Sequence, residues 1–162
     1  KSFWKTDKSL NKNSIGIEIS NSGHQYGYKN FNNKQIKSLL KISKYLIKKY
    51  KIKKNNILGH SDVAPTRKKD PGEKFPWKFL AKKNIGVWHK LKSNECKKNR
   101  NKKISEDDTV FFNKLKKFGY KIEGLDKKGQ KKLIKNFQRR FRPELVNGKI
   151  DLECFEILNN LI

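Results

Sequence analysis

The chain has 162 residues, of which 34% are hydrophobic and 35% charged; this suffices for one compact domain, with or without a small appendage, and excludes a purely disordered tail. Forty-one Lys and Arg against 15 Asp and Glu give a net charge of +26, which would attract nucleic acid, anionic lipid or other acidic polymers. Yet 36 of the 41 basic residues are Lys, whereas proteins that read bases or grip phosphates favour Arg. The charge is therefore a weak functional signal, and we expect no specific nucleic-acid partner.

Cysteine content and hydropathy exclude two further classes of protein. Cys96 and Cys154 cannot form a disulfide framework, and neither has the spacing of a metal ligand pair. No apolar run approaches the roughly 20 residues that a membrane-spanning helix needs, so we expect no transmembrane segment. The chain begins at Lys1 rather than Met and carries no signal-peptide core in residues 1–10. This start favours a fragment or a processed form.

The first half of the chain reads as strand, helix, strand. In residues 15–20 three isoleucines alternate with Gly16 and Glu18, which is typical of a strand buried on one face, with Glu18 on the other face. A Gly- and Asn-rich loop follows, and residues 34–50 place apolar side chains at helical spacing. Residues 57–60 predict a short buried strand ending at a histidine. This order predicts an α/β fold with a mixed sheet covered by helices.

The next segment combines prolines, aromatic residues and then a polar run. Residues 61–88 hold three of the four prolines and so cannot be regular throughout, while their aromatic side chains favour an ordered loop. Residues 91–104 are rich in Lys and Asn, which favours an interdomain linker.

A second unit is predicted over residues 105–162. Ser105 to Asp108 has capping-box spacing before an apolar stripe that ends at Gly119. A second helix is expected over about 126–141, and Asp151 can cap a third. These elements predict a small C-terminal three-helix bundle.

His60 and Asp70 are the residues most suited to catalytic chemistry. An imidazole nitrogen and a carboxylate oxygen are both good zinc ligands, and a catalytic zinc site uses three protein ligands and an open position. On spacing alone a surface histidine beside a loop aspartate is the commoner arrangement. Both interpretations stay open at this point.

Four sequence blocks, in this order along the chain, favour the interpretation of His60 and Asp70 as zinc ligands. They are Asn13–Glu18, Gly59–Pro65, Arg67–Gly72 and Phe75–Trp77. Together they resemble the zinc-dependent N-acetylmuramoyl-L-alanine amidases related to bacteriophage amidases and peptidoglycan-recognition proteins, over about residues 3–89. The resemblance implies a catalytic domain at residues 1–90 that cleaves the amide bond between N-acetylmuramic acid and L-alanine, in degradation, remodelling or recycling of the bacterial cell wall.

The C-terminal unit adds a second resemblance. Residues 118–120, 137–143 and 147–151 look like the small three-helix peptidoglycan-binding domain that often follows this amidase. The two resemblances imply peptidoglycan or muropeptides as partners and a location in the periplasm or cell envelope, with the cytoplasm as the alternative. We also expect a monomer.

The amidase resemblance also implies roles for individual residues. His60 and Asp70 would be zinc ligands, Glu18 would move the proton of the attacking water, and Lys68 would stabilise the developing oxyanion. His24, in a Gly-rich loop, would border the substrate. Each residue also has a plainer interpretation, in which Glu18 is an exposed strand residue, Lys68 one surface lysine of many and His24 a surface histidine.

The chain departs from the family pattern in one respect. Such amidases take a first zinc histidine from a strand near the start of the domain, and no residue here matches it. We expect an N-terminally truncated domain without that strand; the alternatives are that His24 substitutes or that metal binding is weak. A catalytically inactive peptidoglycan-binding protein is therefore the alternative function, and a nucleic-acid binder ranks last.

Overall fold

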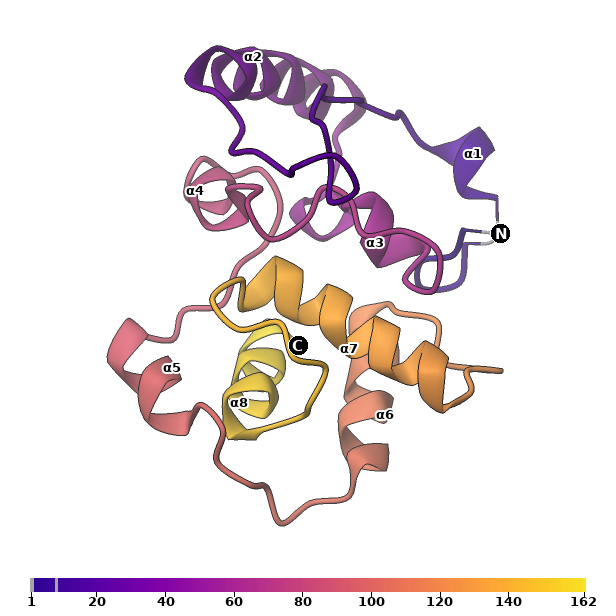
Figure 1. Cartoon of the computed structure of the whole chain (residues 1–162). Coiled ribbons are helices and arrows are strands. Elements are labelled where there is room, and N and C mark those ends of the chain that lie inside the picture. The colour runs from indigo at the N-terminus through magenta and orange to yellow at the C-terminus, as the bar shows by residue number, and fades with distance from the viewer. Residues whose placement is uncertain (1, 8) are drawn as a thin grey trace.

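The computed structural model describes residues 2–7 and 9–162, and the regular secondary structure in this part of the chain is helical (Figure 1). Its α-helices are α1 (Leu10–Asn13), α2 (Asn33–Tyr50), α3 (His60–Val63), α4 (Trp77–Lys82), α5 (Ser93–Asn99), α6 (Asp108–Phe118), α7 (Lys127–Phe141) and α8 (Leu152–Leu161). A short 3-10 turn, η1 (Lys54–Asn56), leads from α2 toward α3. None of the described helices combines the length and apolarity needed to cross a membrane.

The predicted α/β fold with a mixed sheet is wrong. Over residues 2–7 and 9–162 the backbone forms one isolated bridge, between Trp4 and Asp7, and no strand. Residues 14–32 form no helix or strand, and Ile15 and Ile17 are 50% and 41% exposed; only Ile19 of that face packs against a core. The alternating pattern is present, but no neighbouring strand lies beside it to form a ladder and cover its apolar face.

The second predicted strand, residues 57–60, is replaced by a turn into α3. A guanidinium nitrogen of Arg140 donates to the carbonyl oxygen of Ile57 at 3.1 Å, and the Gly59 N–H donates to the Asp62 carboxylate at 2.7 Å. Side chains thus satisfy backbone groups that a ladder would otherwise use. His60 therefore begins a helix instead of ending a strand.

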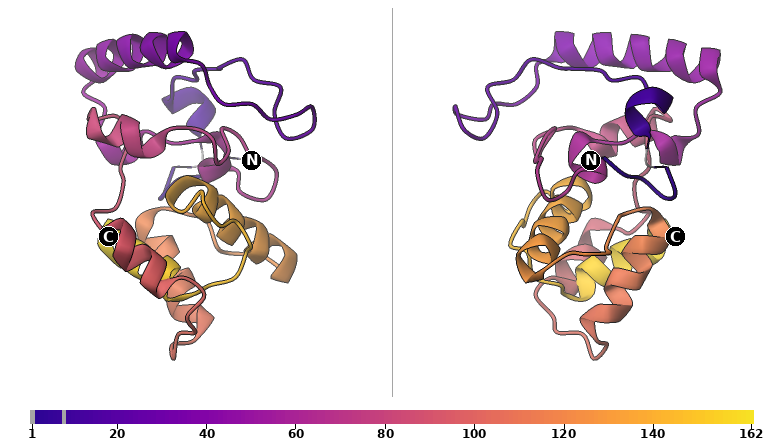
Figure 2. Two further views of the ribbon diagram at one scale, coloured as in Figure 1. Left: turned by 60° about the vertical axis from the view of Figure 1, so that its left-hand side comes forward. Right: turned by 90° about the vertical axis from the view of Figure 1, so that its right-hand side faces the viewer.

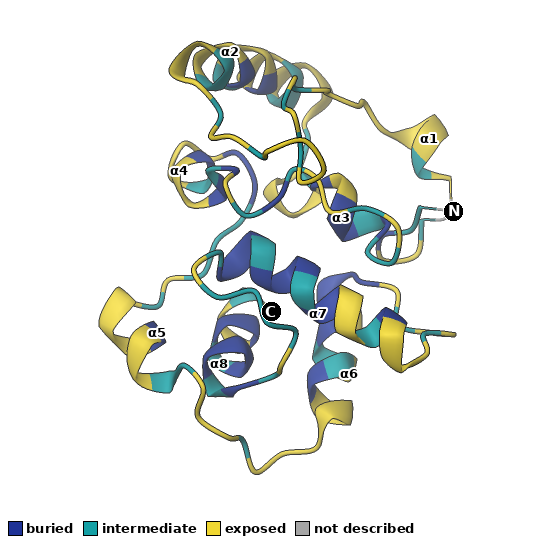
Figure 3. Ribbon diagram, in the orientation of Figure 1, coloured by how far each residue is buried: buried dark blue, intermediate teal, exposed yellow. Residues whose placement is uncertain are grey.

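Helix α2 confirms the predicted helix over residues 34–50. Asn32 caps it and forms a reciprocal capping box with Gln35. Its lysines point outward, so most of the helix surface is exposed (Figure 3). Both views of Figure 2 place α2 on the side of the molecule opposite to the C-terminal helices.

Helices α6, α7 and α8 confirm the three predicted C-terminal helices. Asp126 and Asp151 accept hydrogen bonds at the starts of α7 and α8, as predicted for Asp151. Gly119 follows α6 with φ of 142°, and a Cβ there would lie 2.7 Å from the Trp4 ring, so the position requires glycine. The predicted cap at Ser105 is wrong, because the side chain of Asp107 caps α6 through Thr109.

Residues 91–104, the predicted linker, contain helix α5. This helix packs on α8, and its Cys96 is buried. Arg100, which follows the helix, donates two hydrogen bonds of 2.7 Å to the carboxylate of Glu153. The division at 1–90, 91–104 and 105–162 stays a prediction.

Two hydrophobic cores meet at Trp88. One core lies among α6, α7 and α8 and also contains Trp4 from the start of the chain. The other lies under α2 and α4, around Leu39 and Leu80. Trp88 packs against both. The segments before residue 90 therefore share packing with the C-terminal helices.

A buried ion pair joins α3 to α7. Asp62 is 1% exposed and Arg140 is 2% exposed, and the carboxylate of the first contacts the guanidinium of the second. The Tyr120 hydroxyl donates to the same carboxylate at 2.6 Å, and Trp77 stacks on the guanidinium with its ring 4.3 Å away. Burial, and then the Asp62 charge, hold the pKa of Tyr120 well above its usual value, so the phenol remains a donor.

Asp62→Asn should destabilise the fold strongly. The substitution leaves the Arg140 charge buried without a counter-charge, which typically costs about 3–5 kcal/mol. Tyr120→Phe, which removes one hydrogen bond to that carboxylate, should cost about 1–3 kcal/mol. Urea unfolding followed by circular dichroism measures both.

The matched control is Lys116→Gln, which breaks the exposed pair between Lys116 and Glu123. It should leave the urea midpoint unchanged. An Asp62→Asn midpoint as high as that of the control would contradict the importance of the buried pair.

Candidate functional site

The structure brings His60 and Asp70 together. His60 is the first residue of α3, and its Nδ1 lies 3.0 Å from Oδ2 of Asp70 in the loop that follows. The Ser61 N–H donates to the Asp70 carbonyl oxygen at 2.9 Å, which folds the loop back onto α3. Both side chains are substantially exposed, at 43% and 59%. The pair is therefore open to solvent and to a ligand.

The donor chemistry of this pair suits zinc, but the pair alone does not complete a site. An imidazole nitrogen and a carboxylate oxygen are typical zinc ligands, and catalytic zinc sites use three protein ligands. In residues 2–7 and 9–162 no third His, Cys, Asp or Glu joins the two in a group able to hold a metal. The pair could therefore supply at most two of the three ligands that such a site needs.

Lys68 shares the loop with Asp70, whereas Glu18 lies elsewhere in the chain. Lys68 is partly buried, its N–H donates to the Ala64 carbonyl oxygen at 3.0 Å, and its own carbonyl accepts from Asn136 at 2.8 Å. Glu18 is exposed in the extended segment before α2. Within the described part of the chain, neither side chain makes a hydrogen bond or ion pair with His60 or Asp70.

His24 lies beside the end of the same loop, but it belongs to a different cluster. Its Nε2 lies 2.9 Å from a carboxylate oxygen of Glu73, and its ring stacks on Tyr28 with centroids 4.4 Å apart. The Tyr28 hydroxyl donates to the Pro71 carbonyl oxygen at 2.5 Å, and burial raises its pKa to about 12. His24 thus joins no three-ligand group with His60 and Asp70 among the described residues, and the hypothesis that it replaces the absent zinc histidine has no support.

Glu73 is a residue that sequence reasoning missed. Besides His24 it faces Arg139 of α7, with Nε and Oε2 3.4 Å apart. Burial alone would raise the pKa of the Glu73 carboxyl, but the hydrogen bond from His24 and the charge of Arg139 hold it below its usual value. Its partners are 49 and 66 residues away in the sequence, and no local motif marks such a pairing.

Helix α7 supplies most of the polar contacts to the segment that carries the candidate site. Four of its side chains reach residues 57–73: Lys132, Asn136, Arg139 and Arg140. Sequence reasoning placed residues 137–143 in a wall-binding unit and gave α7 no part in the site.

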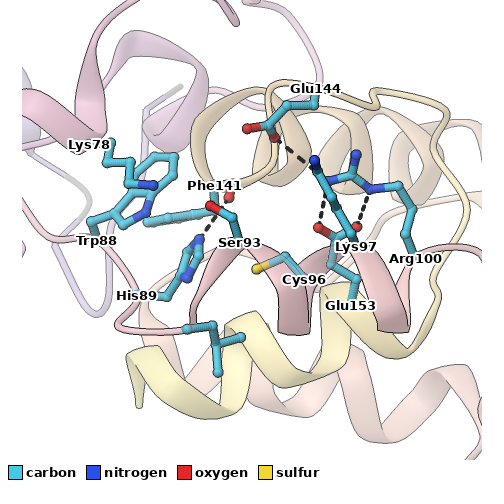
Figure 4. A pocket seen from close by; sticks show the side chains of 11 residues that line it. Lys78, Trp88, His89, Ser93, Cys96, Lys97, Arg100, Phe141, Glu144 and Glu153 are labelled. Atoms are coloured by element: carbon cyan, nitrogen blue, oxygen red, sulfur yellow. Dashed lines mark hydrogen bonds and ion pairs between the residues drawn. The ribbon is translucent and has the colours of Figure 1, made fainter.

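A separate cavity of about 80 Å³ lies where α5, α8 and the end of α7 meet (Figure 4). Its lining includes Trp88, His89, Cys96 and Arg100, and none of the predicted site residues. Burial raises the pKa of the Cys96 thiol, and burial lowers the pKa of His89, whose Nε2 donates to the Phe141 carbonyl oxygen at 3.2 Å. A protonated thiol is a poor nucleophile.

Comparison with known proteins connects the His60–Asp70 segment to one family. A family model described as N-acetylmuramoyl-L-alanine amidase matches residues 2–73, which include Glu18, His60, Lys68 and Asp70. The N-acetylmuramoyl-L-alanine amidase AmiD of Escherichia coli (strain K12) is 35% identical over 168 residues, an alignment that covers 99% of this chain and 61% of that protein.

The chain is thus similar to this amidase family. It is similar over 99% of its length to the solved structure of E. coli AmiD in complex with the substrate anhydro-N-acetylmuramic acid-L-Ala-D-gamma-Glu-L-Lys, with a TM-score of 0.86 and 34% identity. It is equally similar, with a TM-score of 0.86 and 30% identity, to AmpDh3 of Pseudomonas aeruginosa in complex with an anhydromuramic pentapeptide. The chain spans 65% and 66% of those two solved chains.

Glu73→Gln should remove part of the acid sensitivity of the fold. Because folding lowers the Glu73 pKa from 4.5, the interaction contributes fully above about pH 4.5 and is lost as the pH falls through the lowered value. The free energies of unfolding of wild type and Glu73→Gln should therefore differ above about pH 4.5 and converge below it. Urea unfolding across this range measures the difference.

Glu106→Gln is the control, because Glu106 is exposed and makes no ion pair within the described part of the chain. It should follow wild type at every pH. A difference between wild type and Glu73→Gln that stays constant with pH would show that the Glu73 carboxylate is not stabilised by its partners.

Proposed function

We propose that the protein is a zinc-dependent amidase that hydrolyses the amide bond between N-acetylmuramic acid and L-alanine in cell-wall turnover. The observation that carries this proposal is the open His60–Asp70 pair, 3.0 Å apart, within the segment that matches the amidase family. The substrate we propose is a muropeptide. Support comes from AmiD and AmpDh3, whose solved structures hold anhydromuramic peptides and match 99% of this chain.

We propose a separate role in amide hydrolysis for each of four side chains in the matched segment. Zinc, when bound, supplies Lewis acidity that makes water a nucleophile near neutral pH and polarises a carbonyl. His60 and Asp70 would hold it. Glu18 would accept a proton from the attacking water and return it to the departing L-alanine amine. The Lys68 ammonium would stabilise the negative charge that develops on the carbonyl oxygen.

The remainder of the chain suits a wall-associated enzyme. We propose that residues 1–90 form the catalytic part, that residues 91–104 connect it to the next unit, and that residues 105–162 bind peptidoglycan. We propose a monomer that acts in the periplasm or cell envelope. A net charge of +26 would favour contact with an anionic envelope, a contact that salt should weaken.

One observation favours a second function. Among the described residues no three His, Cys, Asp or Glu side chains gather into a group able to hold a metal, so a peptidoglycan-binding protein without catalytic activity is the alternative. It would bind cell-wall sacculi without releasing peptide, even with zinc added.

Glu18→Gln and Lys68→Ala should each lower the rate of muropeptide cleavage by about a hundredfold or more, because they remove the proton carrier and the oxyanion cation. Release of the free peptide from a purified muropeptide, followed by chromatography, measures the loss. The assay uses this chain and a version extended upstream by the preceding codons of the gene.

Lys69→Ala is the matched control for Lys68→Ala, because Lys69 is the exposed lysine next to it. The control should cleave at the wild-type rate. Equal rates for Lys68→Ala and Lys69→Ala would remove Lys68 from the mechanism, and wall binding by both versions without any cleavage would favour the binding protein.

A further inference from the structure

The loop between α3 and Pro71 carries both Lys68 and Asp70, and it contains no helix or strand. Its own backbone bonds are few: the N–H groups of Arg67 and Lys68 both donate to the Ala64 carbonyl oxygen at 3.0 Å. A segment with so few internal bonds needs contacts from outside to hold one conformation.

Asn136, in the middle of α7, supplies such contacts. Its side-chain nitrogen donates to two loop carbonyl oxygens, those of Pro65 and Lys68, both at 2.8 Å. Its side-chain oxygen accepts from a guanidinium nitrogen of Arg139 at 2.8 Å. Two carbonyl partners and one donor partner fix the orientation of the amide, because carbonyls accept and guanidinium groups donate.

Without these hydrogen bonds, an asparagine at position 136 would destabilise the fold. The residue is 1% exposed and lies between the buried apolar residues Leu133, Ile134 and Phe137. Asparagine is a poor residue for a helix interior, and a buried amide is tolerated only when it is hydrogen-bonded. The bonds to the loop are therefore the physical reason for an asparagine here.

Other contacts hold the loop on both sides of Lys68, but at the Lys68 carbonyl the side-chain partner is Asn136. The Lys132 ammonium donates to the Thr66 carbonyl oxygen at 3.0 Å, and the Ser61 N–H donates to that of Asp70. Between these two anchors, Asn136 is the side chain that bonds the Lys68 backbone.

We propose that Asn136 is a positioning residue. It fixes the backbone of Lys68 and thereby holds the side chains of Lys68 and Asp70 in place relative to His60. The inference rests on the proposed function for the roles of Lys68 and Asp70. If Asn136 has this role, helix α7 in the C-terminal part of the chain helps to position the side chains of the candidate site.

Hydrogen exchange tests the structural half of the proposal without any need for activity. In Asn136→Ala, the backbone amides of residues 64–70 should exchange at least about tenfold faster than in wild type, whereas those of residues 147–149 should exchange at the wild-type rate. Gln138→Ala is the matched control, because Gln138 is a buried amide on the same helix that bonds Asn147, Gly148 and Lys149 instead. It should show the reverse pattern. Equal acceleration of both loops in both variants would reduce Asn136 to a general stabilising residue and overturn the proposal.

Zinc binding and kinetics test the functional half. Loss of a residue that orients metal ligands typically costs about ten- to a hundredfold in metal affinity or activity. Asn136→Ala should therefore bind zinc more weakly than Gln138→Ala, and its kcat should fall with little change in KM. Faster exchange at 64–70 with unchanged zinc affinity and kcat would overturn the positioning role. If wild type itself cleaves nothing, the proposed function fails, while exchange and zinc affinity still decide the role of Asn136.

Discussion

The carboxylate of Asp62 and the guanidinium of Arg140 are almost completely removed from water, and the geometry of the candidate site depends on their contact. Two opposite charges in such surroundings stabilise each other only as a pair, since either one left alone would carry a large desolvation cost. Tyr120 adds a hydrogen bond to Asp62, and Trp77 covers the face of the guanidinium. The pair therefore fixes the short helix α3, and with it His60, against helix α7.

This constraint explains how an irregular segment can hold reactive side chains in place. Helix α3 has four residues, too few to be stable by itself. Its stability comes from tertiary contacts, and the same helix α7 that pairs with it through Arg140 also bonds the following loop through Asn136. The C-terminal helices thus support the site that we propose, in addition to any contact they make with the cell wall.

The sequence predicted helices α2, α6, α7 and α8 because their signals are local, but it missed the short helices α1, α3, α4 and α5. The apolar stripe of α2, Gly119 after α6 and the cap at Asp151 each act within a turn or two of the chain. The sheet prediction failed because a strand needs a partner, and the isoleucines at 15–19 alternate correctly without one. His60 and Asp70 are only ten residues apart and lie in two neighbouring blocks of the family resemblance, so their pairing could be predicted. The roles of Glu73 and Asn136 depend on contacts between residues 49 to 71 positions apart, which no motif indicates.

The central claim is that His60 and Asp70 hold zinc in an amidase. The most direct test measures bound zinc by mass spectrometry, in the chain and in its upstream-extended version, for wild type and for His60→Ala combined with Asp70→Asn. We expect zinc to bind the wild-type protein, and muropeptide cleavage to accompany it, while the double variant loses both and remains folded. Zinc retained undiminished in the folded double variant, or cleavage that persists without these two residues, would contradict the claim.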